Sequence, residues 1–314
     1  MSLGAGRQST ALFGLAARGQ WGAHGPALAI VADTQDEPHD FYLHLERLAG
    51  VEWQRCHDDR GRVFYRVVPG IYRGGLLGAA LPVHAVTVGR LSASVLNPYG
   101  AAGAPLFAGP PLYARNPSGE PAVLRRQCTR EFKIAAIERE VRRVLLEQGH
   151  ADVRMRRVRG GGDDPRPHVH VRPGVWVESW QGISRDEATR MKDSRTAWVR
   201  NRYPLVMELG WTADDCVRYN ERHGHGAAKS ACVFCPYTDD ARWRDMKANR
   251  PEDFARAVEF DHALRAGGCR LKGVQSDTYV HRSLRPLDEV DFSNAEDRGQ
   301  VNMFENECEG MCGV

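Results

Sequence analysis

The sequence has almost no charge imbalance and no apolar run long enough to cross a lipid bilayer. Its 43 Lys and Arg residues nearly balance 40 Asp and Glu residues, so the formal net charge is only +3. A membrane-spanning helix needs about 20 consecutive apolar residues. We therefore expect a soluble globular protein without a membrane partner, and we expect any binding charge to be local rather than global.

A secretory signal peptide and internal repeats are also not visible in the sequence. We therefore expect a cytoplasmic, reducing location, in which a framework of disulfides is not favoured. Clustered cysteines under those conditions indicate metal binding or catalysis. The eight cysteines are Cys56, Cys128, Cys216, Cys232, Cys235, Cys269, Cys308 and Cys312.

Strand-like and helix-like segments alternate along the chain. Short apolar segments predict strands over 27–32 and 83–88, and alternation predicts a strand over 175–180. Periodicity and capping residues predict helices over 9–18, 39–48, 129–148, 213–222 and 252–265. This alternation predicts an α/β protein with a Rossmann-like, open, mostly parallel sheet and helices on both faces.

The chain is predicted to have a main domain over residues 1–230 and a Cys-rich C-terminal region with helices and a tail over 231–314. Residues 51–80 look like an insertion and residues 99–122 like a loop, because both stretches are rich in glycine or proline. Four tryptophans in the second half of the main domain are predicted core residues rather than a base-stacking platform. They are Trp176, Trp180, Trp198 and Trp211.

Seven arginines lie between Arg139 and Arg159. Such a run could meet nucleic-acid phosphates. The alternative is a solvated helix face followed by a loop, and we favour it because charge runs usually only solvate a surface.

A glycine-rich turn opens the chain, MSLGAGRQSTAL. Gly4 and Gly6 permit a tight turn before a helix, and the helix N-terminus is favourable for an anion. Ser2, Ser9 and Thr10 can add hydroxyl donors. No Gly-Lys-Ser/Thr follows, so this is not a P-loop of the Walker type.

Four further motifs follow this turn in a fixed order. They are ADTQDEP (32–38), RRQCTREFK (125–133), WQGISRDEATRMKDS (180–194) and CVFCP (232–236). Together with SLGAGRQST (2–10), this order resembles the phosphoadenosine phosphosulfate (PAPS) reductase family. That family belongs to the PP-loop ATP pyrophosphatases, with the adenine nucleotide alpha-hydrolase-like fold.

The resemblance implies a nucleotide site. Its phosphate-binding residues would be Ser2, Gly4, Gly6 and Ser9, and its ribose- or adenine-binding residues Asp33 and Thr34. Gln8 stands where ATP-cleaving relatives often have Asp, which favours the reductase variant over magnesium-assisted cleavage. Gly182, Arg185, Asp186 and Arg190 would line the other side of the phosphate or sulfate, since an Arg fork matches an oxyanion.

Simpler roles are open for three of these residues. Asp33 could form a strand-end turn, and Arg185 and Arg190 could form exposed salt bridges.

A further departure from the family is that only Met1 precedes the glycine turn, where the fold normally has a core strand. Because a missing strand would leave a large gap, we expect the true start to lie upstream of Met1.

The resemblance also implies a [4Fe–4S] cluster held by Cys128, Cys232 and Cys235. Zinc is the alternative, because thiolates bind both, and plain thiols are the third possibility. A fourth ligand could come from Cys216, Cys308 or Cys312, or one iron could stay open.

The chain ends in ENECEGMCGV, which is similar to the Glu-Cys-Gly tail of PAPS reductases. There the tail thiolate attacks sulfur, so Cys308 and Cys312 would attack and then resolve by disulfide exchange. The alternative is a ligand pair that pins the tail.

The predicted activity is thiol-dependent reduction of PAPS or adenylyl sulfate to sulfite, with a thiol reductant as partner. The first alternative is an ATP-dependent sulfurtransferase, with magnesium as a possible cofactor and a cysteine desulfurase as sulfur source. It would thiolate a tRNA base, a DNA phosphate or a small metabolite. The second alternative is a non-catalytic zinc module that binds nucleic acid.

Overall fold

The computed structural model describes residues 1–97, 109–116, 118–157, 163–228, 231–266 and 276–293. Its helices are α1 (Arg7–Ala17), η1 (Gly22–His24), α2 (His39–Ala49), α3 (Leu91–Leu96), η2 (Thr129–Ile134), α4 (Ala135–Glu147), η3 (Arg185–Arg190), α5 (Pro204–Met207), α6 (Ala213–Arg222), α7 (Asp240–Asn249), α8 (Pro251–Ala266) and η4 (Leu287–Glu289). Within these ranges no helix combines the length and the apolarity that a bilayer crossing requires.

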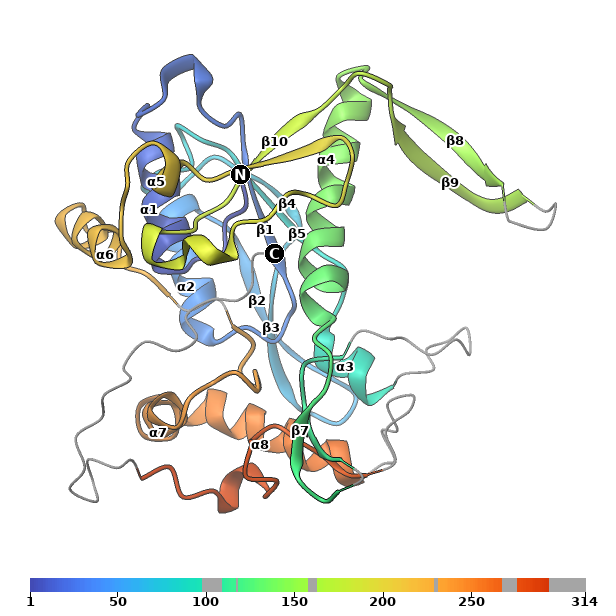
Figure 1. Ribbon diagram of the computed structural model, residues 1–314, viewed down its shortest axis with the longest axis vertical. Helices are drawn as coiled ribbons and strands as arrows, with labels where there is room; N and C mark the ends of the chain where they lie inside the picture. The colour runs from blue at the N-terminus through green and yellow to red at the C-terminus, as the bar shows by residue number, and fades with distance from the viewer. Residues whose placement is uncertain (98–108, 117, 158–162, 229–230, 267–275, 294–314) are drawn as a thin grey trace.

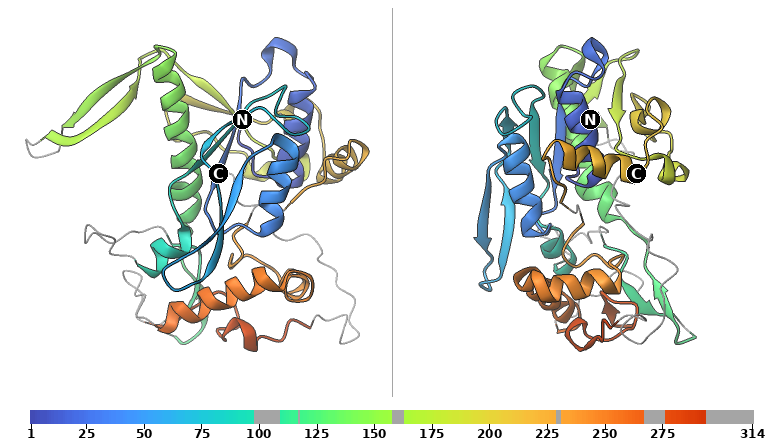
Figure 2. Two further views of the ribbon diagram at one scale, coloured as in Figure 1. Left: turned by 180° about the vertical axis from the view of Figure 1, so that it is seen from behind. Right: turned by 90° about the vertical axis from the view of Figure 1, so that its left-hand side faces the viewer.

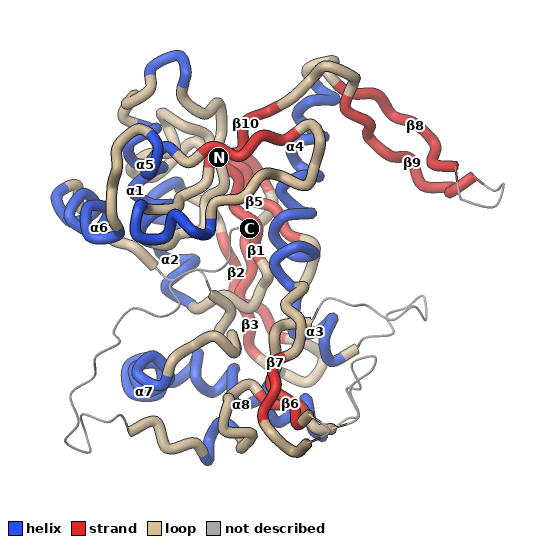
Figure 3. The backbone as a smooth tube through the Cα atoms, in the orientation of Figure 1, coloured by secondary structure: helices blue, strands red, loops and turns tan. Residues whose placement is uncertain are grey.

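The strands alternate with these helices (Figures 1 and 3). They are β1 (Ala29–Asp33), β2 (Trp53–His57), β3 (Val63–Val67), β4 (Gly70–Tyr72), β5 (Val83–Thr87), β6 (Tyr113–Arg115), β7 (Pro121–Val123), β8 (Ala151–Arg157), β9 (Asp163–Val171), β10 (Val177–Trp180), β11 (Val199–Arg202) and β12 (Thr278–Tyr279). The α/β class predicted from the sequence is therefore confirmed.

The sheets are small and mixed. β5 pairs in parallel with β1 and antiparallel with β4, and β10 pairs in parallel with β11. The remaining pairs, β2–β3, β8–β9 and β12–β6–β7, are antiparallel. The described strands are thus not assigned to one open parallel sheet.

An extended segment at the start of the chain lies between β1 and β10. Leu3 N donates to Ile30 O at 2.8 Å, and Ile30 N donates to Met1 O at 2.9 Å. Ser2 forms a parallel bridge with Ile30, and its N–H donates to Trp180 O at 3.1 Å. Residues 1–3 therefore lie alongside β1, and their hydrogen bonds link β1 to β10.

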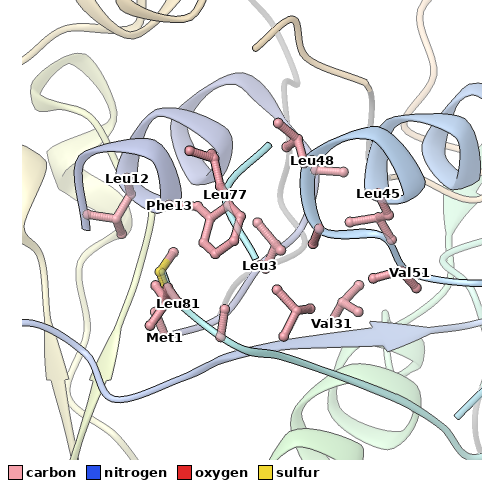
Figure 4. Close-up of a cluster of buried hydrophobic side chains, with 14 of the residues drawn as sticks. Met1, Leu3, Leu12, Phe13, Val31, Leu45, Leu48, Val51, Leu77 and Leu81 are labelled. Atoms are coloured by element: carbon pink, nitrogen blue, oxygen red, sulfur yellow. The ribbon is translucent and has the colours of Figure 1, made fainter. Parts of the chain in front are cut away.

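Helices cover both sides of β1. Ala29 and Val31 face the first hydrophobic cluster, which includes residues of α1 and α2. Figure 4 shows Met1 and Leu3 in this cluster with Phe13 and Leu48. Ile30 and Ala32 point to the opposite face, as strand alternation requires, and α4 lies on that side (Figures 1 and 2).

A second hydrophobic cluster lies around α7 and α8. It joins Leu91, Leu112 and Phe132 to Phe234 and Phe260. Phe234 stacks on Phe260 with ring centroids 3.8 Å apart. The cluster therefore includes residues on both sides of the predicted boundary at residue 230.

Two segments that the sequence predicted to be an insertion and a loop contain strands. Residues 51–80 form β2, β3 and β4 and bury Tyr65 and Val67 in the first cluster. Residues 99–122 are not only a loop, since β6 lies within them and β7 begins at Pro121. Trp180 is buried as predicted, but Trp176 is 47% exposed.

A buried histidine links α1 and α2 and makes stability depend on pH. Nε2 of His44 lies 3.0 Å from Thr10 Oγ1, and burial lowers the pKa of His44 from 6.5 to about 4. The unfolded chain therefore takes up this proton at a higher pH than the folded chain. Stability that is present above pH 6.5 is lost as the pH falls toward 4.

We expect the unfolding free energy to fall by about 2–3 kcal/mol more in the wild type than in His44→Gln between ~pH 7 and ~pH 4.5. Urea denaturation at both pH values measures this difference. The matched control is His24→Gln, because His24 is exposed. An acid loss as large in His44→Gln as in the wild type would assign the effect to other groups.

Candidate functional site

The carboxyl ends of neighbouring parallel strands meet at one edge of the structure. The glycine turn follows residues 1–3, the 33–38 loop follows β1, and the 87–90 loop follows β5. Gln35 Nε2 donates to Thr87 Oγ1 at 3.1 Å, and Thr87 Oγ1 donates to Asp33 O at 2.9 Å. Ligands of open α/β sheets bind at such an edge.

The backbone is strained at two of these strand ends. Ala5 has φ of 57° and Gln35 has φ of 61°, which makes them two of the three non-glycine residues with positive φ in the described part of the chain. Such conformations cost free energy and gather at functional sites. The strain therefore marks the glycine turn and the 33–38 loop.

The glycine turn leads directly into the N-terminus of α1. Gly6 is the N-cap residue, and α1 has neither a side-chain cap nor an acidic residue in its first turn. Ser9 Oγ donates to Gly6 O at 3.1 Å and accepts from Gly4 N at 3.3 Å. Ser9 thus holds the turn, while the positive end of α1 is not neutralised by a side chain.

Gly182 packs directly against this helix start. A Cβ atom at residue 182 would lie 2.8 Å from both the N and the Cα of Ser9. Gln8, which follows the turn, directs Nε2 to Ser184 Oγ at 3.4 Å and to Glu187 Oε2 at 3.3 Å. The 180–194 segment and the glycine turn are therefore brought together, and Gln8 serves as a link between them.

A cavity of about 820 Å³ lies beside these segments, between α4 with η2 on one side and β1, residues 1–4, β10 and β11 on the other. Its apolar lining includes Ile30, Ile137 and Val141. Its lining also has four acidic and seven basic residues, the latter being Arg125, Arg126, Arg130, Lys133, Arg190, Lys192 and Arg195. An apolar wall with an excess of positive charge suits a ligand with an aromatic base and phosphates.

Only some of the predicted site residues line this cavity. Ser2, Gly4 and Arg190 are among its lining residues. Arg190 also pairs with Glu187 at 2.7 Å. Arg185 is exposed and is not among the lining residues, and Asp186 accepts from Ala213 N at the start of α6.

Asp33 is turned to the interior. Its carboxylate accepts from Gln35 N at 2.7 Å, Val67 N at 2.8 Å and Tyr42 Oη at 2.9 Å. Burial raises its pKa from 3.8 to about 7, against the effect of these hydrogen bonds. The side chain forms the strand-end turn that was the alternative to a ribose contact.

Thr34 places the 33–38 loop next to the C-x-x-C motif. Its Oγ1 lies 3.3 Å from Cys232 Sγ and donates to Glu37 Oε1 at 3.2 Å. Because the Thr34 hydroxyl proton is donated to Glu37, the Cys232 thiol donates its own proton to Thr34 Oγ1. Burial, and then the charge of Glu37, raise the pKa of Cys232 well above its usual value. Cys232 is therefore a protonated thiol in this arrangement.

Glu37 is a buried carboxylate that sequence reasoning missed. Lys133 Nζ lies 2.9 Å from its Oε1, while Oε2 is buried without a hydrogen-bond partner in the described part of the chain. Both residues stand inside motifs singled out by the sequence, ADTQDEP and RRQCTREFK. The only sequence signal was this location, because the ion pair joins residues 96 positions apart.

The three predicted metal ligands are only partly brought together. Cys128 and Cys232 both pack against the second hydrophobic cluster, and Cys128 contributes to the pKa shift of Cys232. Cys235 follows one turn later, its N–H donating to Cys232 O at 2.9 Å. Gln127 and Thr129, the neighbours of Cys128 in the sequence, line the cavity. None of the three cysteines is among its lining residues.

No group of three or more His, Cys, Asp or Glu residues in the described ranges is arranged to hold a metal ion. Cys216, a candidate fourth ligand, lies in the first hydrophobic cluster, away from the cluster that Cys128 and Cys232 contact. Burial raises its pKa to about 12. Cys216 therefore packs apart from Cys128 and Cys232, while Cys308 and Cys312 lie outside the described residues.

The chain was also compared with known proteins. No family model, curated protein or solved structure matches it. The function must therefore be argued from the site itself.

Gly182→Ala should destabilise the protein by about 1–3 kcal/mol, because the new methyl group would meet the backbone of Ser9 and α1 would have to move. Urea denaturation measures the loss. Gly70→Ala is the matched control, since the nearest atom to its Cβ would be 3.5 Å away on the Tyr72 side chain. Equal stabilities for the two variants would contradict the close approach at Gly182.

Proposed function

We propose that this protein is an enzyme that binds an adenine nucleotide in the 820 Å³ cavity and carries out sulfur chemistry on it. The observation that carries the proposal is the combination of an apolar wall with seven basic residues, next to the uncapped start of α1. Adenine would lie on the apolar wall, and its phosphates would face Ser2, Gly4, Arg190 and Lys192. Arg and Lys are suited to phosphate oxygens.

The proposed reaction is reduction of PAPS or adenylyl sulfate to sulfite. A cysteine thiolate bonds to the sulfate sulfur while the bond from that sulfur to the phosphate oxygen breaks, which releases the nucleotide and leaves a thiosulfonate. A second thiol then attacks the cysteine sulfur, so that sulfite leaves and a disulfide forms. An external dithiol returns both cysteines to thiols.

Cys308 is the proposed nucleophile, from the resemblance of the tail. Cys232 is the proposed second thiol, because its proton has a route through the Thr34 hydroxyl to the buried Glu37 carboxylate. A thiol with a raised pKa attacks slowly until that proton is removed. Thr34 and Glu37 would thus act as positioning and proton-accepting groups.

The iron–sulfur cluster and its zinc alternative stay predictions. Because the described cysteines do not assemble a group that could hold a metal ion, no step of the proposed reaction passes through either one.

An ATP-dependent sulfurtransferase is the second candidate. The β8–β9 hairpin supports it, because the exposed side chains of Arg154 and Arg172 offer a surface for a nucleic-acid acceptor. Against it, the Gln8 amide contacts Ser184 and Glu187 rather than presenting a magnesium ligand to the cavity.

Arg190→Gln should weaken ATP and PAPS binding by about tenfold or more, because a charged hydrogen bond to phosphate contributes about 1.5–3 kcal/mol. Isothermal titration calorimetry measures the affinity. Arg185→Gln is the matched control, since Arg185 lies on the same short helix but outside the cavity lining. Equal losses in both variants, or no binding of either nucleotide to the wild type, would contradict the proposed site.

The products separate the two candidate reactions. The anaerobically purified protein with a dithiol should release sulfite from PAPS, and should not release AMP and pyrophosphate from ATP. The Cys308→Ser and Cys232→Ser variants should each lose sulfite release while still binding PAPS, and Cys56→Ser should retain it. Release of AMP and pyrophosphate alone would favour the sulfurtransferase, and full activity of the Cys308→Ser variant would remove the tail from the reaction.

A further inference from the structure

β8 (Ala151–Arg157) and β9 (Asp163–Val171) form an antiparallel hairpin that projects from the end of α4, away from the rest of the chain (Figures 1 and 2). We refer to this hairpin as the arm. It is a two-stranded ribbon, and its pairing places Arg154 opposite His168 and Asp152 opposite His170. A ribbon that leaves the body in this way packs little of its own surface against the core.

The two faces of the arm differ in chemistry. Because side chains alternate along a strand, Asp152, Arg154, His168 and His170 share one face. Val153 and Met155 share the other face, and they are 56% and 54% exposed. Both faces are therefore open to solvent, which is unusual for an apolar strand face without a partner.

The basic charge of the 139–159 run is divided between α4 and the arm. On α4, Arg143 is paired with Glu140 and Glu147, and Arg142 with Glu138. This is the solvated helix face that was the favoured interpretation of the run. On the arm, Arg154 lies 3.8 Å from the carboxylate of Asp152, which also pairs at 2.9 Å with Arg172, the residue directly after β9.

The ion pairs of the arm are exposed and weak. The side chains of Arg154 and Arg172 are 59% and 52% exposed. Exposed pairs contribute about 0–1 kcal/mol, so a phosphate group can replace Asp152 as their partner. β8 carries two further arginines, Arg156 and Arg157, toward its end.

An aromatic residue lies at the root of the arm. Trp176, between β9 and β10, is 47% exposed, and the Arg200 guanidinium carbon lies 3.9 Å from its ring centroid. Val177 and Glu178, the next two residues, line the cavity. The arm and the cavity are thus joined by one short stretch of chain.

We propose that the arm binds duplex DNA by lying in the major groove, with Arg154 and Arg172 on backbone phosphates and Trp176 with Arg200 against the strand at the root of the arm. The major groove of B-form DNA admits a two-stranded β-ribbon. The major groove of A-form RNA is too narrow for one.

This inference does not rest on the nucleotide chemistry, and DNA binding is measured without nucleotide. Fluorescence anisotropy of a labelled DNA duplex of about 20 base pairs, titrated with the full chain at several salt concentrations, gives the affinity and its salt dependence. Arg154→Ala/Arg172→Ala should bind about tenfold or more weakly. The slope of log affinity against log salt should fall by about two, one for each lost phosphate contact.

The matched control is Arg218→Ala/Arg282→Ala. It removes the same charge from two ion-paired arginines of 65% and 63% exposure, on α6 and after β12. Its affinity should stay within about twofold of the wild type. Three results would overturn the inference: no binding of DNA by the wild type, equal losses in the two double variants, or binding of an RNA duplex of the same sequence as tightly as DNA.

Discussion

The hydrogen bonds of the loop after β1, residues 33–38, are the interactions on which the rest of the structure depends. Asp33 holds β3 through Val67 N, and Asp36 accepts from Ser92 N at 2.6 Å at the start of α3. The carbonyl of Asp36 accepts from Val233 N in the C-x-x-C motif at 2.8 Å. One short loop thus fixes a strand, a helix and the cysteines relative to β1.

The same loop also ties in α4 and α8. Glu37 pairs with Lys133 beneath α4, and its carbonyl accepts from Arg256 Nη1 on α8 at 3.1 Å. Glu37 and Arg256 are buried and Lys133 is half-buried, and a buried carboxylate without its cation is costly. The loop therefore contacts residues of both hydrophobic clusters, since Asp33 accepts from Tyr42 and the Asp36 carbonyl accepts from Val233.

This constraint also brings the glycine turn and the Cys232 thiol to the same end of β1. Ala228 N donates a hydrogen bond to Ala5 O in the glycine turn at 3.0 Å. Cys232, four residues after Ala228, lies next to Thr34. Ala228 therefore contacts the glycine turn, and Cys232 contacts the 33–38 loop. The strained residues Ala5 and Gln35 lie on the two loops that form this junction.

Local features of the fold could be predicted from the sequence. The helix over 213–222 was predicted from Thr212 and the acidic first turn, and both parts of its capping box are present. The strands near 29–33 and 83–87 were predicted from short apolar runs. Gly182 was singled out because the resemblance implied that it lines the same site as the glycine turn, and it packs against Ser9.

Features that depend on contacts between distant residues could not be predicted in this way. The role of residues 1–3 depends on hydrogen bonds to Ile30 and Trp180, which no local pattern reveals. The Glu37–Lys133 pair and the interior contacts of Asp33 have the same origin. Trp176 was misassigned to the core because an aromatic residue next to a strand is more often buried than exposed.

The most direct test of the central claim is to map where an adenine nucleotide binds. The full chain is irradiated with 8-azidoadenosine triphosphate, digested and analysed by mass spectrometry, with and without excess ATP or PAPS. The account predicts labelling that the competitor removes, confined to the N-terminal peptide around Ser2–Gly4 and the cavity wall over 125–145. Competed labelling on α7 and α8 instead, or none at all, would contradict it.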